Sequence, residues 1–310
     1  MREDATVLVI GEDVDRSVSG ATRGLIEEFG PRRVWNAPIS EAGFAGAAVG
    51  ASMVGARPVV DLMYGSFFYV AMDQVVNQAA RWTFMSGGNV RLPIVFMASM
   101  GPSSSSAAQH SESPHPMLMA AAGLKVVIPS NPHDAKGLML ASIRDPNPVV
   151  FLRDAALGGT RGELPDEPFA IELGKARIRR QGDDVSVVAI GSTVPMALEA
   201  AADFEHDGIS VEVIDPLTLV PLDRAAIVTS VRKTRRLVVC DNARVTGSAA
   251  SEIVAIVVEE ALTSLRSAPR RVAWPDAPMP FAPTLERGVV VTKDRIAHAI
   301  RQVLSPEIEP

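Results

Sequence analysis

Short apolar runs alternate with helical patterns along most of the chain, and this alternation is typical of parallel sheets covered by helices on both faces. Five strands are predicted in the first half, at Thr6–Ile10, Pro58–Met63, Pro93–Met97, Lys125–Ile128 and Pro148–Leu152. The predicted helices between them are Glu41–Ala56, Tyr69–Met85 and Pro132–Arg144. The fold class we expect is therefore α/β.

A second α/β unit is predicted in the C-terminal half. Its expected strands are Val185–Ile190, Val211–Ile214, Arg236–Cys240 and Arg271–Ala273, and its expected helices are Val194–Phe204, Arg224–Arg232, Ser248–Leu265 and Lys293–Val303. Between the two units, a stretch rich in Gly, Pro and acidic residues has no clear period. The predicted organisation is a first doubly wound domain over 1–155, a linker over 156–172 and a second doubly wound domain over 173–310.

Composition narrows the class of protein. The chain has 310 residues, of which 47% are hydrophobic and 21% charged, so it can form two domains with large cores. Its net charge of −6 gives no electrostatic reason to expect a nucleic-acid partner. The single Cys240 fits a buried strand residue in a cytoplasmic protein, and neither a signal peptide nor a membrane span is predicted.

The run Pro38-Ile39-Ser40-Glu41-Ala42-Gly43 is the most informative segment. It follows a short apolar stretch at Val34 and Trp35 and precedes a helix made almost entirely of small residues. Such strand-to-helix turns are where open α/β sheets usually hold ligands. A carboxylate beside a closely packing helix is costly to bury unless a partner hydrogen-bonds it. Glu41 is therefore either a ligand-binding carboxylate or a helix-start acid favoured by the macrodipole.

Many separate blocks in the same order resemble the β chains of the thiamine-diphosphate-dependent 2-oxo acid dehydrogenases, which act on pyruvate, branched-chain 2-oxo acids and acetoin. The resemblance runs from Thr6 to about Phe151 and is looser beyond it. The matching blocks are Gly11–Val14, Pro38–Gly43, Arg57–Val60, Ala71–Ala80, Met85–Gly88, Ala107–Ser111, Gly123–Val127, Asp134–Leu138, Ile143–Phe151, Val213–Leu219 and Pro221–Asp223. The fold that this implies is a pyrimidine-binding domain followed by a transketolase C-terminal-like domain.

The resemblance implies roles for three side chains. Glu41 matches the carboxylate that hydrogen-bonds the aminopyrimidine ring of thiamine diphosphate and favours its imino tautomer. Phe67 matches an aromatic ring that packs on the aminopyrimidine, although Phe67 or Phe68 could also simply fill core. His110 matches a catalytic histidine that hydrogen-bonds the substrate, and a histidine suits proton transfer near neutral pH.

A potassium ion is also implied by the resemblance. The positions that match its ligands, largely through backbone oxygens, are Ile94, Ser142, Ile143, Asp145 and Asn147. Hard cations prefer oxygen ligands, and a turn supplies carbonyls without burying charge. An ordinary Asp-Pro-Asn turn would explain the same residues.

No Gly-Asp-Gly segment occurs in the sequence, and the family holds the magnesium ion and the diphosphate of the cofactor through such a segment. The resemblance therefore implies a separate α chain that carries the diphosphate and magnesium half of the site. It also implies a second β chain in a heterotetramer, and a lipoyl domain or acyl carrier protein as acceptor.

Departures from the family leave the reaction open between two alternatives. A serine-rich loop, Ser103 to Ser106, stands where the relatives are rich in glycine. The segment Pro116–Ala122 lacks a second histidine, and the chain begins almost at its first strand. The first hypothesis is a subunit that decarboxylates a 2-oxo acid and passes the acyl group to a lipoyl carrier. The alternative is transketolase-like transfer of a two-carbon ketol unit from a sugar phosphate to a carrier protein, and a non-catalytic scaffold is a third hypothesis.

Overall fold

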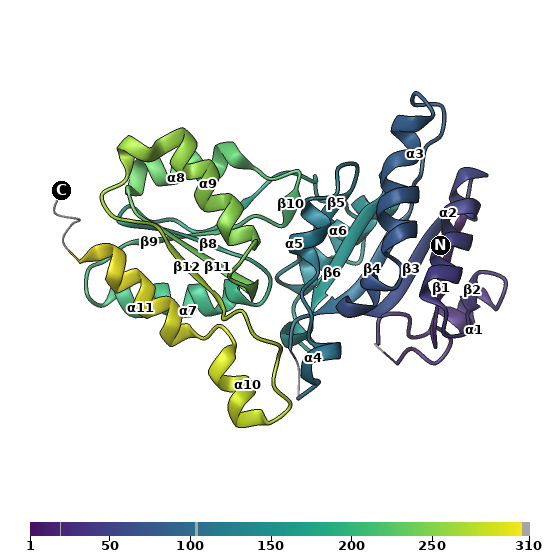
Figure 1. The fold of residues 1–310 in the computed structure, drawn as a ribbon, viewed down its shortest axis with the longest axis horizontal. Coiled ribbons are helices and arrows are strands. Elements are labelled where there is room, and N and C mark those ends of the chain that lie inside the picture. Colours follow the sequence, from purple (N-terminus) through teal and green to yellow (C-terminus); the bar gives the residue numbers. More distant parts are fainter. Residues whose placement is uncertain (19, 103–104, 306–310) are drawn as a thin grey trace.

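The structure is a computed structural model that describes residues 1–18, 20–102 and 105–305, and it contains two sheets side by side (Figure 1). Both sheets are mostly parallel and carry helices, so the predicted α/β class is confirmed. The loop residues 103–104, which belong to the predicted serine-rich loop, lie outside the described residues.

The first sheet has seven strands in the order β10-β5-β6-β4-β3-β1-β2. Its strands are β1 (Val7–Gly11), β2 (Val34–Asn36), β3 (Arg57–Tyr64), β4 (Val95–Met100), β5 (Lys125–Val127), β6 (Val149–Asp154) and β10 (Thr218–Val220). The α-helices of this half are α1 (Leu25–Phe29), α2 (Glu41–Met53), α3 (Ala80–Met85), α4 (Ala107–His110), α5 (His115–Met119) and α6 (Pro132–Arg144).

The second sheet has five strands in the order β12-β11-β8-β9-β7. These strands are β7 (Arg177–Arg180), β8 (Val185–Ala189), β9 (Val211–Asp215), β11 (Leu237–Arg244) and β12 (Arg270–Trp274). The helices of this half are α7 (Thr193–Glu205), α8 (Arg224–Thr234), α9 (Ala249–Ala261), the 3₁₀ turn η4 (Leu262–Ser264), α10 (Pro283–Val289) and α11 (Lys293–Leu304).

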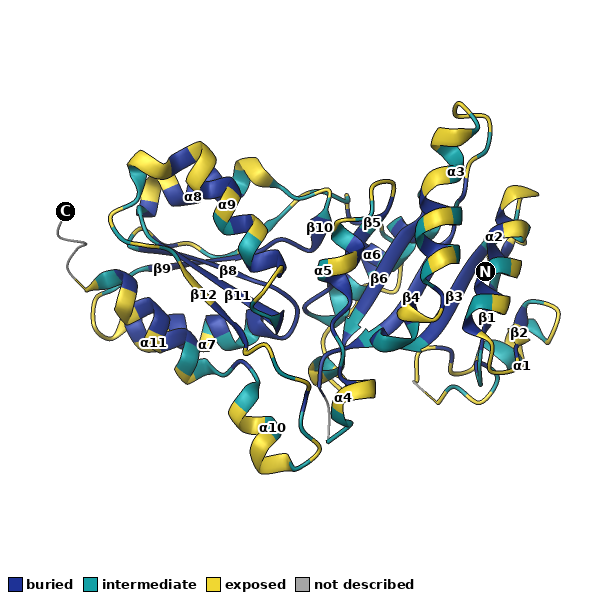
Figure 2. Ribbon diagram, viewed as in Figure 1, coloured by how far each residue is buried: buried dark blue, intermediate teal, exposed yellow. Residues whose placement is uncertain are grey.

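Burial follows the predicted pattern, since the central strands of both sheets are buried and the helices expose their outer faces, whereas the edge strands β2 and β7 are largely exposed or half-buried (Figure 2). The largest side chains in the first core include Phe68, Phe96 and Phe151, all almost fully buried. Within the described part of the chain, no helix is long and apolar enough to cross a membrane. A cytoplasmic location stays a prediction.

The predicted continuous helix Tyr69–Met85 is helical from Met72 onward, but its start is wrong and its middle is not an α-helix. The chain forms a 3₁₀ turn η1 (Gly65–Tyr69), a π-helical segment η2 (Asp73–Ala79) and only then the α-helix α3. π-helical segments occur mostly as insertions in helices and are frequent near functional sites, and hydrophobic periodicity does not reveal them. The turn η1 carries Phe67, so this irregular stretch determines where the predicted aromatic ring lies.

The small-residue helix α2 packs closely on η2, as its composition suggests. A side chain at Gly46 would come within 3.3 Å of Gln74. The helix ends at Met53, three residues before the predicted end at Ala56. Glu41 stands at its first position.

One strand crosses between the halves and was not predicted. Strand β10 follows β9 in sequence, yet it pairs antiparallel with β5 at the edge of the first sheet. Figure 1 shows β10 between the two halves. A three-residue strand is too short for its pattern to reveal which sheet it joins.

Polar contacts join the carboxyl half of β11 to the first residue of α5 and to the segment before this helix. His115 Nε2 lies 2.9 Å from Asp241 Oδ1, and both side chains are fully buried. Arg244 donates two hydrogen bonds, of 2.7 and 2.9 Å, to Glu112. These contacts hold the second domain against the loop that carries α4 and therefore His110.

Candidate active site

Glu41 is buried at the start of α2, with 8% of its surface exposed. The turn before it is tight, because a side chain at Gly43 would meet the Ser40 hydroxyl at 2.6 Å. Among the residues that the structure describes, none donates a hydrogen bond to the Glu41 carboxylate. A buried carboxylate of this kind has the capacity to accept a hydrogen bond from a ligand.

Glu12 lies close enough to Glu41 for their charges to interact. Burial raises the pKa of the Glu12 carboxyl, and the nearby charges of Asp13 and Glu41 raise it further. Glu12 follows β1 and Glu41 is the first residue of α2, which follows β2, so both residues lie at the carboxyl end of the sheet. This is the edge at which doubly wound sheets bind ligands.

Tyr64, Phe67 and His110 form a cluster of three rings, which we call the aromatic triad. The ring centroids of Tyr64 and His110 are 4.5 Å apart, those of Phe67 and His110 5.7 Å, and those of Tyr64 and Phe67 5.6 Å, all in edge-to-face arrangements. The three side chains come from the end of β3, from η1 and from α4. The Ser66 hydroxyl donates to the Gln109 carbonyl and ties η1 to α4.

The structure distinguishes the two neighbouring phenylalanines. Phe68 is fully buried and fills core, whereas Phe67 is half-buried and contacts His110. His110 itself is exposed. Phe67 and His110, which are 43 residues apart in the sequence, are therefore brought together at the surface.

The residues of the predicted potassium site gather at the amino ends of β4 and β6, beside the end of α6. The Ile94 carbonyl accepts a hydrogen bond of 2.9 Å from the Val149 N–H, and the Ile143 carbonyl accepts one of 2.8 Å from Arg57. The Asp145 carboxylate accepts from Lys125 and from the Asn147 backbone and side chain.

These contacts limit how a cation could bind there. The Asp145 carboxylate already accepts hydrogen bonds, and the carbonyls of Ile94 and Ile143 each accept one. A potassium ion would therefore have to bind the second lone pair of these carbonyl oxygens. The site lies at the carboxyl end of α6, where the helix dipole favours a cation. Within the described ranges, no group of three or more His, Cys, Asp or Glu side chains is arranged to hold a metal. The potassium site stays a prediction.

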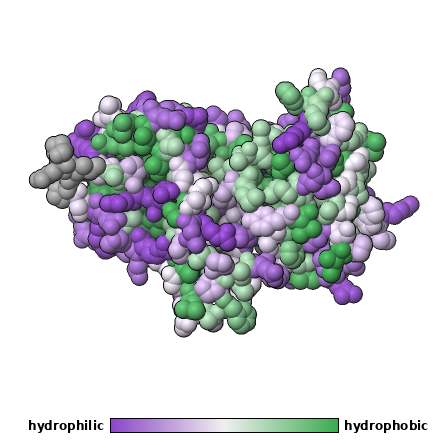
Figure 3. All heavy atoms as spheres, viewed as in Figure 1, coloured by the Kyte–Doolittle hydropathy of each residue, from purple (hydrophilic) through white to green (hydrophobic). Residues whose placement is uncertain are grey.

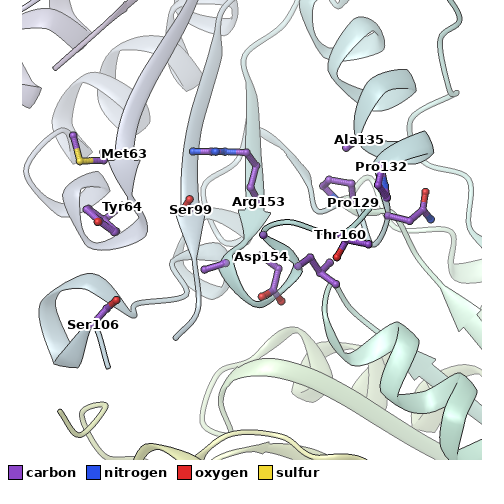
Figure 4. A pocket seen from close by; sticks show the side chains of 14 residues that line it. Met63, Tyr64, Ser99, Ser106, Pro129, Pro132, Ala135, Arg153, Asp154 and Thr160 are labelled. Carbon is purple, nitrogen blue, oxygen red and sulfur yellow. The ribbon is translucent and has the colours of Figure 1, made fainter. Parts of the chain in front are cut away.

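A pocket of about 460 Å³ opens beside the aromatic triad (Figure 4). It is lined by Met63 and Tyr64 from β3, Ser99 from β4, Arg153 and Asp154 from β6, and by Ser106, Pro129, Asn131, Pro132, Ala135, Ala155, Leu157, Gly158 and Thr160. Glu41, Phe67 and His110 do not line this pocket. Sequence reasoning missed Tyr64 and Arg153, although each lies at the carboxyl end of an observed parallel strand, and that position is typical of ligand sites.

Asp154 anchors the pocket floor to the second domain. Its carboxylate accepts a hydrogen bond of 2.9 Å from the Ser192 N–H and others from the Asn242 amide and the Ala156 N–H. Burial raises the pKa of the Asp154 carboxyl, and these donors act in the opposite direction. Gly101, with φ of 80°, passes so close to Asn242 that a side chain there would meet its amide at 2.8 Å.

Comparison with known proteins decides the family. The family model of the transketolase pyrimidine-binding domain matches residues 1–157, and that of the transketolase C-terminal domain matches residues 174–296. The β subunit of the acetoin:2,6-dichlorophenolindophenol oxidoreductase of Bacillus subtilis (strain 168) is 43% identical over 98% of this chain and 93% of its own length. The chain belongs to the β subunits of the thiamine-diphosphate-dependent 2-oxo acid dehydrogenases. The predicted resemblance is therefore confirmed.

Other members of the family match equally broadly. The 2-oxoisovalerate dehydrogenase β subunit of Bacillus subtilis (strain 168) is 39% identical over 98% of this chain and 94% of its own length. The pyruvate dehydrogenase E1 β subunit of Rickettsia bellii (strain RML369-C) is 42% identical with the same coverage. These relatives do not favour the ketol-transfer alternative.

A solved structure supports the fold. A chain described as a split-gene transketolase in an inactive β4 tetramer superimposes with a TM-score of 0.80 at 23% identity, over 99% of this chain and 94% of that chain. At this identity the likeness concerns the fold alone. It confirms a pyrimidine-binding domain followed by a transketolase C-terminal domain.

Proposed function

We propose that this chain supplies the aminopyrimidine half of an active site that it shares with an α subunit, and that the complex decarboxylates a 2-oxo acid and passes the acyl group to a lipoyl carrier. The observation that carries the proposal is the buried Glu41 carboxylate, which lacks a hydrogen-bond donor among the described residues. Thiamine diphosphate, when bound, supplies the carbon nucleophile for decarboxylation. The donor that fits Glu41 is a protonated ring nitrogen such as that of the aminopyrimidine.

Each of the three predicted side chains has a task in this proposal. Glu41 accepts the ring N–H and holds that proton in place, at a site where burial strengthens the hydrogen bond. Phe67 offers the exposed side of its ring as a wall for a flat heterocycle. His110 presents its imidazole beside that wall, where it can donate to or accept from the substrate.

The surface around Glu41 supports a partner chain. Ile39, two residues before it, is 75% exposed, and Trp35 is 52% exposed. Apolar side chains at the rim of a binding site commonly mark a protein interface. Hydrophobic residues also reach the surface over the projecting helix α10, where Phe281 and Leu285 are exposed (Figure 3).

We infer an α2β2 heterotetramer in which the α subunit carries the diphosphate and magnesium. The sequence has no Gly-Asp-Gly segment for these groups, and closed two-fold assemblies are the commonest kind. A potassium ion held by the carbonyls of Ile94 and Ile143 belongs to the same proposal.

Co-expression with an α subunit tests the function. The purified complex should bind thiamine diphosphate with magnesium in a calorimetric titration. It should also decarboxylate pyruvate or a branched-chain 2-oxo acid, or cleave the carbon–carbon bond between the carbonyl and carbinol carbons of acetoin. Cofactor binding without turnover of any of these would refute the dehydrogenase proposal. No cofactor binding by an assembled complex would instead support a scaffold.

A further inference from the structure

We propose that Arg244 and Glu286 of the second domain are positioning residues for His110. Each contacts the loop that carries α4, Arg244 after this helix and Glu286 before it, and together they determine where the imidazole lies against Phe67. The inference rests on the proposed function, because the task of His110 belongs to that proposal. It goes further, because it assigns part of the active site to residues of the second domain.

The loop that carries His110 is not held by its own local structure. Helix α4 has only four residues, and Ser105 and Ala107, just before it and at its start, have φ values of 61° and 58°. For residues other than glycine this left-handed conformation is costly, and it persists only where surrounding contacts hold it. A single helical turn is also unstable in isolation. The position of His110 therefore depends on contacts with the rest of the molecule.

Arg244 holds the segment after α4. It is the last residue of β11 and donates hydrogen bonds of 2.7 and 2.9 Å to the two carboxylate oxygens of Glu112, whose side chain is only 11% exposed. Paired bonds of this kind fix the direction of a carboxylate as well as its distance. The Glu112 carbonyl in turn accepts a hydrogen bond of 3.2 Å from the Gly101 N–H. Glu112 therefore joins both ends of the loop to the second domain, two residues away from His110.

Glu286 holds the segment before α4. Its Oε2 atom accepts a hydrogen bond of 3.1 Å from the Ser105 N–H, and Ser105 is one of the two residues in the left-handed conformation. Glu286 lies on α10, and Figure 1 shows α10 and α4 at the same edge of the molecule. A hydrogen bond from a backbone N–H to a carboxylate is stronger than one between neutral groups. The contact therefore supports a strained residue directly.

The turn η1, which carries Phe67, lies against the same segment. At its first residue, Gly65, a side chain would come within 2.5 Å of the Glu112 carbonyl oxygen. At its last residue, burial and the charge of Glu112 raise the pKa of the Tyr69 hydroxyl to about 12. A shift of Glu112 would therefore change the placement of His110 relative to Phe67. Misplacing a reacting group by about 1 Å can cost about 100-fold in rate.

Rate assays of the α/β holoenzyme, with the 2-oxo acid that it decarboxylates fastest, test both residues. We expect Arg244→Ala and Glu286→Ala each to lower kcat about tenfold or more. Glu286→Gln keeps an acceptor oxygen for the Ser105 N–H, so its kcat should stay within about threefold of wild type. Equal losses in Glu286→Ala and Glu286→Gln would overturn the role assigned to this contact.

A double-mutant cycle with His110→Ala separates positioning from a purely structural role. If Arg244 and Glu286 act through His110, replacing either one should lower kcat less than about twofold once the imidazole is gone. The same loss with and without the imidazole would overturn the proposal. If Arg244→Ala does not assemble, Glu286→Ala still completes the cycle, because α10 has no buried residue.

Arg224→Ala is the matched control for Arg244→Ala. Arg224 also donates to a glutamate of the second domain, at 2.7 Å from Glu260. It lies on α8, and Figure 1 shows α8 on the opposite side of the second domain from α10. Its loss should change kcat less than about twofold, and a loss equal to that of Arg244→Ala would contradict a specific role for Arg244.

Amide exchange gives a readout that does not need turnover. Backbone amides over residues 105–112 should exchange with deuterium at least about tenfold faster in Arg244→Ala and Glu286→Ala than in wild type or Arg224→Ala, as measured by mass spectrometry. If the complex turns over a 2-oxo acid but the cycle shows no coupling to His110, the positioning role is wrong although the proposed function stands. If no 2-oxo acid reacts, the proposed function fails; unchanged exchange would then overturn this inference as well, whereas faster exchange would support the hold of the second domain on the loop.

Discussion

Arg179 should be the most important single ion-pairing side chain for holding the two domains together. It lies on β7 with 17% of its side chain exposed, and it contacts two carboxylates that are fully buried, Asp134 at the start of α6 and Asp215 at the end of β9. Its Nη2 atom is 2.7 Å from Asp215 Oδ2, and its Nε atom is 3.1 Å from the same oxygen. Arg179→Met removes the charge from both carboxylates and keeps most of the apolar stem.

The magnitude follows from what remains. Removing one partner of a buried ion pair costs about 3–5 kcal/mol. Asp215 keeps the Ser130 hydroxyl at 2.5 Å and the Leu217 N–H at 3.1 Å, and Asp134 keeps Arg177 at 3.1 Å, so we expect the lower end, about 3 kcal/mol. For domains of this size, that corresponds to a fall in Tm of roughly 6–12 °C.

Thermal unfolding of the α/β complex at one fixed protein concentration measures this effect, since partner binding itself shifts Tm. The control is Arg177→Met. Arg177 also contacts Asp134, but 39% of its side chain is exposed, so its loss should cost about 1 kcal/mol or less. If the two variants lower Tm equally, the account of the Arg179 contacts is wrong.

Three further predictions concern titratable groups. Burial raises the pKa of Asp134, but Arg179 outweighs this effect and holds the pKa below its ordinary value. The ion pair therefore stabilises the fold above about pH 4, and this stabilisation is lost as the pH falls further. The difference in Tm between wild type and Arg179→Met should shrink in acid, and a constant difference from pH 7 to pH 3 would contradict this prediction. His110→Ala should lower kcat by about 100-fold or more and leave Tm unchanged, because His110 is exposed. His115→Ala should instead lower Tm by several degrees, because His115 is buried against Asp241. The opposite pattern in rate assays and melting curves would contradict both assignments. Burial raises the pKa of the Cys240 thiol. Iodoacetamide at pH 8 should therefore alkylate the native protein at least about 100-fold more slowly than the unfolded chain, as measured by mass spectrometry. Equal rates would show that the thiol is accessible in the native protein.

Much of the fold could be predicted because hydrophobic periodicity reports on burial. The strand predicted at Pro148–Leu152 and the helix predicted at Pro132–Arg144 correspond to β6 and α6, whose buried residues recur as expected. The pattern could not predict η1 and η2, because a 3₁₀ or π-helical turn keeps the local composition of a helix. It also could not place β10 in the first sheet, since pairing with β5 depends on distant residues.

The candidate site was predictable only where motifs matched. The family resemblance pointed to Glu41, Phe67 and His110, and the structure brings the last two into contact. Their roles in chemistry stay predictions. Tyr64 and Arg153 carry no motif, and their meeting beside one pocket depends on the order of strands in the sheet, which sequence alone does not reveal.

The most direct test of the shared active site is hydrogen–deuterium exchange at the thiazolium carbon of thiamine diphosphate bound to the α/β complex, measured by NMR after acid quench. Glu41→Gln keeps the size of the side chain and removes its charge, so exchange should slow by about 100-fold or more while Tm and α-chain binding persist. The control is Glu252→Gln, which changes an exposed carboxylate in the first turn of α9 and should leave exchange unaffected. Wild-type exchange in Glu41→Gln, with cofactor bound, would show that Glu41 is only a helix-start carboxylate and would contradict the proposed site.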